Sequence, residues 1–187
     1  MSRLVPALAA LGLLATVTGA SAQAPGTTNP DLQFAAAAAS SGHAEVDLGH
    51  LALKKSSRED IRQFAQRMVD DHAKVNQQLA AVAMHQHLRL PHYAEGQDAA
   101  EVKHLSGLSG PEFDHTYVAL MIEDHRKDVA DFEQEAQRGE VTPIRALANA
   151  TLPMLRAHLQ LAEELPRNTS EEKAQVPPVP PPVDQRQ

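Results

Sequence analysis

The sequence predicts an all-α protein, specifically a bundle of four long helices. Apolar residues recur at intervals of three and four positions in four long segments, which is the period of an amphipathic helix. Proline, glycine or a capping residue bounds each segment. Aromatic residues make up only 3% of the chain and tryptophan is absent, so alanine and leucine must fill the core. This composition favours closely packed helices.

The first two predicted helices follow each other closely in the chain. The first covers residues 30–55, with Asn29 as its cap and a proline at the first helical position. The second covers residues 57–87, where Ser57 and Asp60 form a pair that resembles a capping box. We expect a short turn between the two helices.

The third and fourth predicted helices each begin with a proline. The third covers residues 110–138, and Gly139 is its stop signal. The fourth covers residues 142–165 and contains Pro153, which we expect to bend it.

A long connection joins the second and third helices. It runs from about residue 88 to residue 110 and includes a weak helical segment at 97–105. A connection of this length can cross the full height of a bundle, as in ferritin-like topologies. The fold prediction is therefore a ferritin-like four-helix bundle with a long second connection.

The beginning of the chain has the pattern of a secretory signal peptide. Arg3 supplies the positive region, residues 4–17 are mostly apolar, and Ala20-Ser21-Ala22 is a small-x-small cleavage site. The apolar run is shorter than the roughly 20 residues that a membrane-spanning helix needs. We therefore predict cleavage after Ala22 and a periplasmic or secreted protein.

The predicted mature chain has three parts. Residues 23–30 form a linker, residues 31–165 form the bundle domain, and residues 166–187 form a disordered, proline-rich tail. The tail is a candidate contact for a protein partner, and a homo-oligomer is compatible with the sequence.

Charge and composition narrow the range of functions. The chain has 24 acidic and 17 basic residues, which gives a formal net charge of −7. A net negative charge argues against binding to nucleic acids or anionic membranes. No segment after the signal peptide is long and apolar enough to insert into a membrane. Without cysteine, the protein cannot use disulfides.

Each predicted helix carries one strong potential metal ligand on its apolar stripe. These residues are Glu45, His72, His125 and His158. With a helical rise of about 1.5 Å per residue, all four lie near the middle of the bundle. A buried carboxylate is costly unless it is paired or bound to a metal. We therefore predict a metal site in the bundle core.

The ligand set favours a single transition-metal ion. A di-iron carboxylate site requires Glu-x-x-His twice, but the residues three positions before the histidines are Val69, Ile122 and Leu155. One glutamate and three histidines suit zinc, copper or iron. Met68 and Met121 precede His72 and His125 by one helical turn and are candidate soft auxiliary ligands.

Two other interpretations remain open. The buried Glu/His layer could be a structural hydrogen-bond network in a non-enzymatic stress or interaction protein. A metal-dependent oxidase or peroxide-handling activity would need an open coordination position. No nucleophile motif or phosphate-binding glycine loop is present, so the sequence indicates no enzyme chemistry beyond that of a bound metal.

The motifs resemble the bacterial family called domain of unknown function 4142. The resemblance covers about residues 31–165 and includes the segments Glu45-Val-Asp-Leu-Gly49 and Phe64-Ala-Gln-Arg-Met68-Val-Asp-Asp-His72. The matching residues are Glu45, Met68, His72, Asp114, His125, Pro153 and His158. The resemblance implies a ferritin-like four-helix fold and a secreted or periplasmic location. Members are often labelled predicted outer-membrane proteins, and the family has no settled activity.

Overall fold

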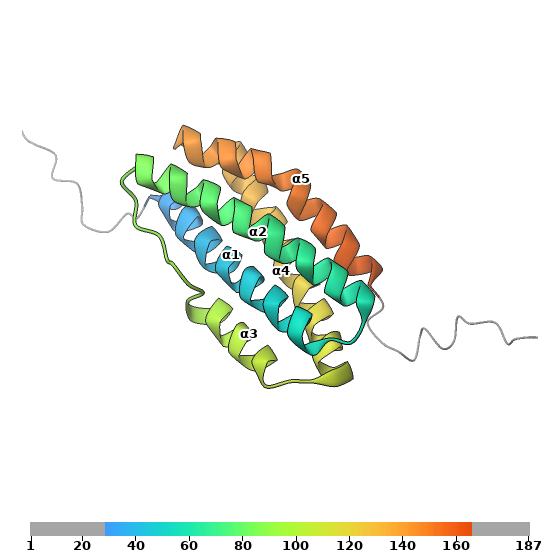
Figure 1. Ribbon diagram of the computed structural model, residues 1–187. Helices are drawn as coiled ribbons and strands as arrows, with labels where there is room; N and C mark the ends of the chain where they lie inside the picture. Colours follow the sequence, from blue (N-terminus) through green and yellow to red (C-terminus); the bar gives the residue numbers. More distant parts are fainter. Residues whose placement is uncertain (1–28, 166–187) are drawn as a thin grey trace, which may run out of the picture.

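The computed structural model describes residues 29–165, and these fold into five helices (Figure 1). They are α1 (Pro30–Lys55), α2 (Glu59–His85), α3 (Gly96–Ser106), α4 (Gly110–Arg138) and α5 (Thr142–Glu164). The described residues contain no strand, so the all-α prediction is confirmed for this part of the chain. The predicted signal peptide, most of the linker and the tail lie outside the described residues.

The number of helices differs from the predicted four, because α3 is a fully formed fifth helix. It lies within the long connection, close to the weak segment at 97–105. Contacts with α1 hold it in place. The Lys55 ammonium at the end of α1 donates to the carbonyl oxygens of Ser106 and Leu108, at 2.8 and 2.7 Å. Tertiary contacts therefore support a helix that has only a weak signal in the sequence.

The four longer helices lie side by side, and the long connection returns along the whole bundle (Figure 1). α1 packs mainly against α2, and α4 packs mainly against α5. α2 also contacts α5, and α1 contacts α4, which closes the arrangement. Because the connection crosses the bundle, α2 and α4 run in the same direction (Figure 1).

Both ends of α2 lie inside the predicted limits. The helix begins at Glu59, because the backbone is still extended at Ser56 and Arg58. The Arg58 amide donates to Oγ of Ser56, and no capping-box hydrogen bond forms at the cap residue Arg58. The helix ends at His85, and His87 adopts a positive φ of 54°, which a helix cannot continue.

The start of α1 agrees with the sequence and also connects distant parts of the chain. The Asn29 side chain accepts a hydrogen bond from the Asp31 amide at 2.8 Å, and Pro30 is the first helical residue. The buried Asp31 carboxylate accepts from the amides of Glu140 and Val141 in the turn between α4 and α5. The N-terminal end of α1 is therefore attached to that turn.

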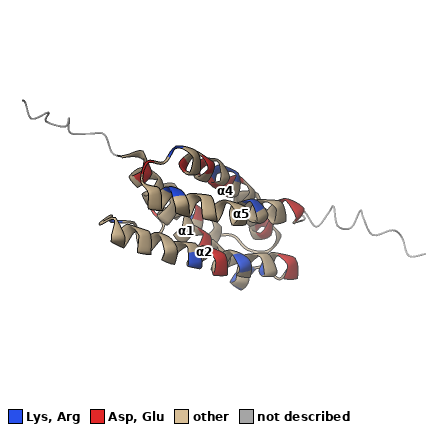
Figure 2. Cartoon of the chain, turned by 90° about the horizontal axis from the view of Figure 1, so that it is seen from above, with Lys and Arg blue, Asp and Glu red and all other residues tan. Residues whose placement is uncertain are grey.

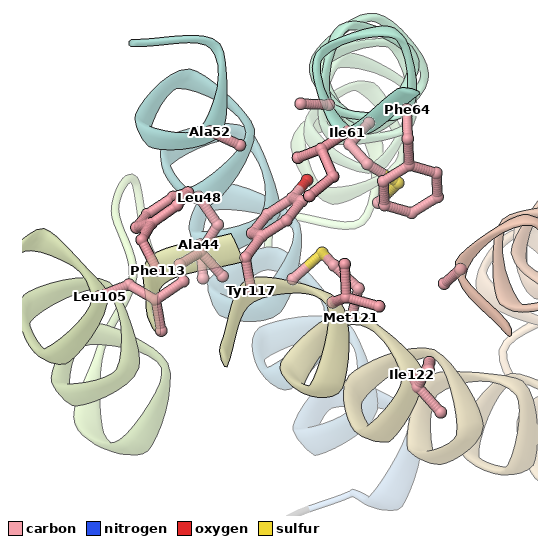
Figure 3. Packing of buried hydrophobic residues seen from close by; sticks show 14 residues of the cluster. Ala44, Leu48, Ala52, Ile61, Phe64, Leu105, Phe113, Tyr117, Met121 and Ile122 are labelled. Carbon is pink, nitrogen blue, oxygen red and sulfur yellow. The ribbon is translucent and has the colours of Figure 1, made fainter. Parts of the chain in front are cut away.

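The largest hydrophobic cluster packs around the first half of α4 (Figure 3). Phe113 and Tyr117 are fully buried, and their rings stack with centroids 5.9 Å apart. Leu48 of α1 and Leu105 of α3 belong to the same cluster. α3 therefore contributes to the core instead of lying on its surface.

The three-and-four spacing that predicts Glu45 on the apolar stripe of the first helix also places Phe34 and Ala38 there, but the buried positions differ in the first half of α1. Ala35 and Ala39 are buried there, whereas Phe34 and Ala38 are only partly buried. The reason is that α1 contacts all four other helices, so more than one of its faces is covered. A single three-and-four stripe describes only a helix with one buried face.

The remaining features concern α5 and the surface. α5 continues through Pro153, and its ribbon bends partway along its length (Figure 1). Acidic and basic residues both occur on α2, α4 and α5 (Figure 2). None of the described helices has the length and apolar character needed to cross a membrane.

Candidate metal centre

Three buried histidines from three helices converge in the bundle core. His72 of α2, His125 of α4 and His158 of α5 are 3%, 0% and 1% exposed. One ligand nitrogen from each histidine lies within 4.8 Å of the other two. The ring centroids are 5.4 to 5.6 Å apart. The prediction that these residues share one level of the bundle is therefore confirmed.

Hydrogen bonds on the outer side of two imidazoles fix their orientation. The Nδ1 atom of His125 lies 2.8 Å from the Met121 carbonyl oxygen, one turn earlier in α4. The Nε2 atom of His158 lies 2.9 Å from a carboxylate oxygen of Asp71 in α2. Both partners are acceptors, so these nitrogens carry the protons. The opposite ring nitrogens are then unprotonated and carry lone pairs.

Each histidine keeps one buried nitrogen without a hydrogen-bond partner among the described residues. These atoms are Nε2 of His72, Nε2 of His125 and Nδ1 of His158. In His125 and His158 this is the nitrogen opposite the hydrogen-bonded one. Buried polar atoms normally have partners, because an unsatisfied group costs about 1–3 kcal/mol. Three such atoms in one cluster indicate a site for a ligand.

The surroundings keep the three imidazoles neutral. Burial lowers the pKa of His72 well below its ordinary value, and His125 and His158 lower it further. Burial, with repulsion from His158, lowers the pKa of His125 to about 4. Burial also lowers the pKa of His158, although the Asp71 carboxylate acts in the opposite direction. Neutral imidazoles at pH 7 are the form that binds metal ions.

Glu45 lies beside this cluster, on the outer side of one ring. Its side chain is buried, and Oε1 is 3.7 Å from Nδ1 of His125, the nitrogen that already donates to Met121. Both carboxylate oxygens lack a hydrogen-bond partner among the described residues. Burial, followed by repulsion from Asp124 and Asp128, raises the pKa of Glu45 well above its usual range. The group of converging donors in the described chain contains the three histidines and not Glu45.

The two predicted methionine ligands are fully buried within the large hydrophobic cluster. Met68 and Met121 pack there with apolar and aromatic side chains, and Figure 3 shows Met121 beside Tyr117. The carbonyl group of Met121 has a clear role, because it holds the His125 ring. A role for either sulfur as a ligand stays a prediction.

Asp71 also contributes to the histidine cluster, although its role is hard to recognise from the sequence. It directly precedes His72, so its side chain points about 100° away from that residue around the helix. From there it reaches His158 on α5 instead. A carboxylate that accepts from the second nitrogen of a metal-binding histidine is a common arrangement in metal sites. Only the packing of α2 against α5 creates this pair.

Together, the fold and site define a helical protein with a buried three-histidine cluster. The chain belongs to the family described as a domain of unknown function, DUF4142, whose model matches residues 16–165. No curated protein sequence matches the chain.

Two solved structures have similar folds. One is a DUF305 fragment from Deinococcus radiodurans, with a TM-score of 0.62 and 21% identity, covering 73% of this chain and 94% of that one. The other is a DUF305 protein from Streptomyces coelicolor, named as a secreted protein, with a TM-score of 0.61 and 20% identity. The alignment covers 72% of this chain and 88% of that one. At this identity the likeness shows the fold alone.

Proposed function

We propose that this protein binds one transition-metal ion, zinc, copper or iron, in the core of its helical bundle. His72, His125 and His158 would supply the ligands. Two observations carry the proposal: one ring nitrogen from each histidine lies within 4.8 Å of the other two, and each histidine has one buried nitrogen without a hydrogen-bond partner among the described residues. Imidazole nitrogen is a suitable donor for all three metals.

The spacing of the donors supports this proposal. A tetrahedral zinc ion with Zn–N bonds of about 2.0–2.1 Å places its nitrogens roughly 3.3 Å apart. The three donor atoms lie within 4.8 Å of one another, so shortening the nitrogen–nitrogen distances by at most roughly 1.5 Å would suffice for such bonds. Small side-chain rotations can supply that movement, with the helices kept in place. Three protein ligands leave a fourth position, for which Glu45, Met68 and Met121 remain the predicted candidates.

The hydrogen-bond pattern favours metal binding over a purely structural polar layer. A structural network is retained when its members satisfy one another. Here the Met121 carbonyl accepts a hydrogen bond from Nδ1 of His125, and the Asp71 carboxylate accepts one from Nε2 of His158. The opposite nitrogens of these two rings are left with lone pairs. Lone pairs on these two neutral rings repel each other, whereas a cation between them would be attracted to both.

The proposal includes export. A signal peptide cleaved after Ala22 would place the mature bundle in the periplasm or outside the cell. The naming of one structural neighbour as a secreted protein is consistent with this location. A metal site built from histidine requires no cysteine, which suits the composition of the chain.

Elemental analysis of the protein purified without an affinity tag tests the proposal directly. We expect about one transition-metal ion per chain after equilibration with Zn²⁺, Cu²⁺ or Fe²⁺ and removal of excess metal. Binding should also raise the Tm, because a ligand that binds only the folded state stabilises it. The variant His72→Gln should bind at least tenfold more weakly, whereas His104→Gln, an exposed histidine on α3, should match the wild type.

Two outcomes would contradict the proposal. One is the absence of stoichiometric metal together with an unchanged Tm for every metal tested. The other is a loss of stability in His72→Gln that is the same with and without metal. The second outcome would support the structural interpretation instead.

A further inference from the structure

A cavity lined by acidic residues lies next to the histidine cluster, where α1, α3 and α4 meet. It has a volume of about 120 Å³. Five carboxylic acids line it: Glu45 from α1, Asp98 and Glu101 from α3, and Asp124 and Asp128 from α4. Such a concentration of acidic groups in a small space is costly unless something offsets their repulsion.

Glu45 is the member of this group that indicates a ligand. Its side chain is 1% exposed, lines the cavity, and has no hydrogen-bond partner for either carboxylate oxygen among the described residues. The 3.7 Å from its Oε1 to Nδ1 of His125 is too long for a hydrogen bond. A buried carboxylate without a partner is expensive, and a cation is the direct means of offsetting that cost.

Among the described residues, Lys127 is the one basic residue that lines the cavity, and its ammonium group is directed elsewhere. The Lys127 ammonium is exposed and lies 2.9 Å from the Asp131 carboxylate, which is not part of the lining. Asp98 accepts a hydrogen bond from Ser40, and Asp128 accepts one from Ser41 at 3.2 Å. These neutral donors orient the carboxylates without cancelling their charge.

Burial and repulsion between neighbouring acidic groups affect the pKa of a carboxylic acid in the cavity. Burial raises the pKa of Asp128 to about 7, and repulsion from Asp131 and Asp98 acts in the same direction, although Lys127 and Ser41 act against the increase. A bound divalent cation would favour the ionised carboxylates.

We infer that this cavity is a second cation site, which takes a hard divalent ion such as Ca²⁺ or Mg²⁺ with part of its water shell. Donors that are all oxygen atoms suit these ions and distinguish the site from the three-histidine cluster. Within the described residues, the three histidines are the one group of three or more acidic or histidine donors that converges within 4.8 Å, so the carboxylates of the cavity do not converge as closely as a set. Water must therefore complete the coordination, and 120 Å³ holds about four water molecules.

Isothermal titration calorimetry of the full mature chain with Ca²⁺, and separately with Mg²⁺, tests this inference. The titrations use chelator-treated protein in about 150 mM NaCl, so that diffuse attraction to the acidic surface is screened. We expect saturable binding of one ion per chain. The double variant Asp98→Asn/Glu101→Gln should weaken it at least tenfold. The control Asp70→Asn/Glu59→Gln makes the same change in charge at exposed positions on α2 and should stay within twofold of the wild type.

Two further variants test the role of Glu45 and the independence of this site from the three histidines. Glu45→Gln should also weaken Ca²⁺ binding at least tenfold, with unfolding by urea checked in chelator to confirm that the variant folds. His158→Gln should lose transition-metal binding and keep Ca²⁺ binding. The inference is overturned if neither Ca²⁺ nor Mg²⁺ binds saturably, if the charge-matched control loses as much affinity as the cavity variant, or if His158→Gln abolishes Ca²⁺ binding.

Discussion

The Nε2 atom of His158 on α5 lies 2.9 Å from the Oδ2 atom of Asp71 on α2. The two residues are 87 positions apart in the chain. This hydrogen bond links two helices of the histidine cluster and selects the tautomer of His158. The proton is held at Nε2, so Nδ1 keeps its lone pair inside the core.

Asp71→Ala should therefore weaken transition-metal binding without removing a ligand. Loss of the carboxylate frees the tautomer and the ring orientation of His158, and comparable changes in metal sites cost about 10- to 100-fold in affinity. Competition with a chromophoric chelator measures the effect. Asp70→Ala, at the neighbouring exposed position, is the matched control and should be near wild type. Equal affinities for Asp71→Ala and the control would show that the Asp71–His158 contact does not support a metal site.

The histidine cluster was predictable because each histidine occupies a buried position on a regular helix. The helix boundaries and the rise per residue were enough to place all three at one height. Height along the bundle does not specify the side of the bundle axis on which a residue lies. Glu45 is near the same level, but it faces the outer nitrogen of His125. Its distance from the inner nitrogens depends on helix rotation, which the sequence pattern defines poorly.

The acidic cavity was not predictable for a different reason. It requires α3 to lie against both α1 and α4, and the position of α3 depends on the path of the long connection. The hydrogen bond between Ser40 and Asp98 and the contacts of Lys55 with Ser106 and Leu108 determine that path. These are contacts between residues more than 50 positions apart, without a local signal in the sequence.

The metal-free protein should lose stability in acid because of its buried histidines. Burial and His158 lower the pKa of His125 to about 4, whereas an unfolded histidine has a pKa of about 6.5. The unfolded chain thus binds more protons between these values, so the contribution of His125 to stability is lost as the pH falls from about 6.5 to about 4. The full effect is on the order of 3 kcal/mol.

Urea unfolding at a series of pH values, in the presence of a chelator, measures this dependence. The free energy of unfolding of His125→Gln should fall less between pH 7 and pH 4 than that of the wild type, whatever the variant's stability at pH 7. Exposed His104→Gln should reproduce the wild-type slope. If the curve for His125→Gln runs parallel to that of the wild type, the buried neutral state of His125 is not what makes the protein sensitive to acid.

Asp128 should have the opposite effect on the metal-free protein. Burial raises its pKa to about 7, compared with about 4 in the unfolded chain. Its stabilising contribution is therefore complete below about pH 4 and is lost as the pH rises to about 7. An asparagine at this position could still accept the hydrogen bond from Ser41 but would not ionise. Between pH 5 and pH 8, the free energy of unfolding of Asp128→Asn should rise relative to that of the wild type by about 2–3 kcal/mol.

The same chelator-treated protein and urea titrations test the Asp128 prediction. Asp47→Asn removes an exposed carboxylate from α1 and serves as the control, with an expected change near zero. An identical pH dependence for Asp128→Asn and the wild type would mean that Asp128 ionises in the folded protein as an ordinary exposed aspartate does.

Gly49→Ala should separate α1 from α2 and destabilise the bundle. A Cβ atom at this position would lie 2.7 Å from Cγ2 of Val69 and 3.0 Å from the carbonyl oxygen of Ala65. The carbonyl oxygen belongs to the backbone of α2 and cannot rotate away.

Overpacking of this kind costs typically about 1–3 kcal/mol, while the better helix propensity of alanine returns about 1 kcal/mol. We expect a net loss of up to about 2 kcal/mol in the free energy of unfolding. Gly107→Ala is the control, because its Cβ would meet only the His104 carbonyl oxygen at 3.4 Å. If Gly49→Ala is as stable as Gly107→Ala, the two helices can move apart without cost, and the close approach of α1 to α2 is not a requirement of the core.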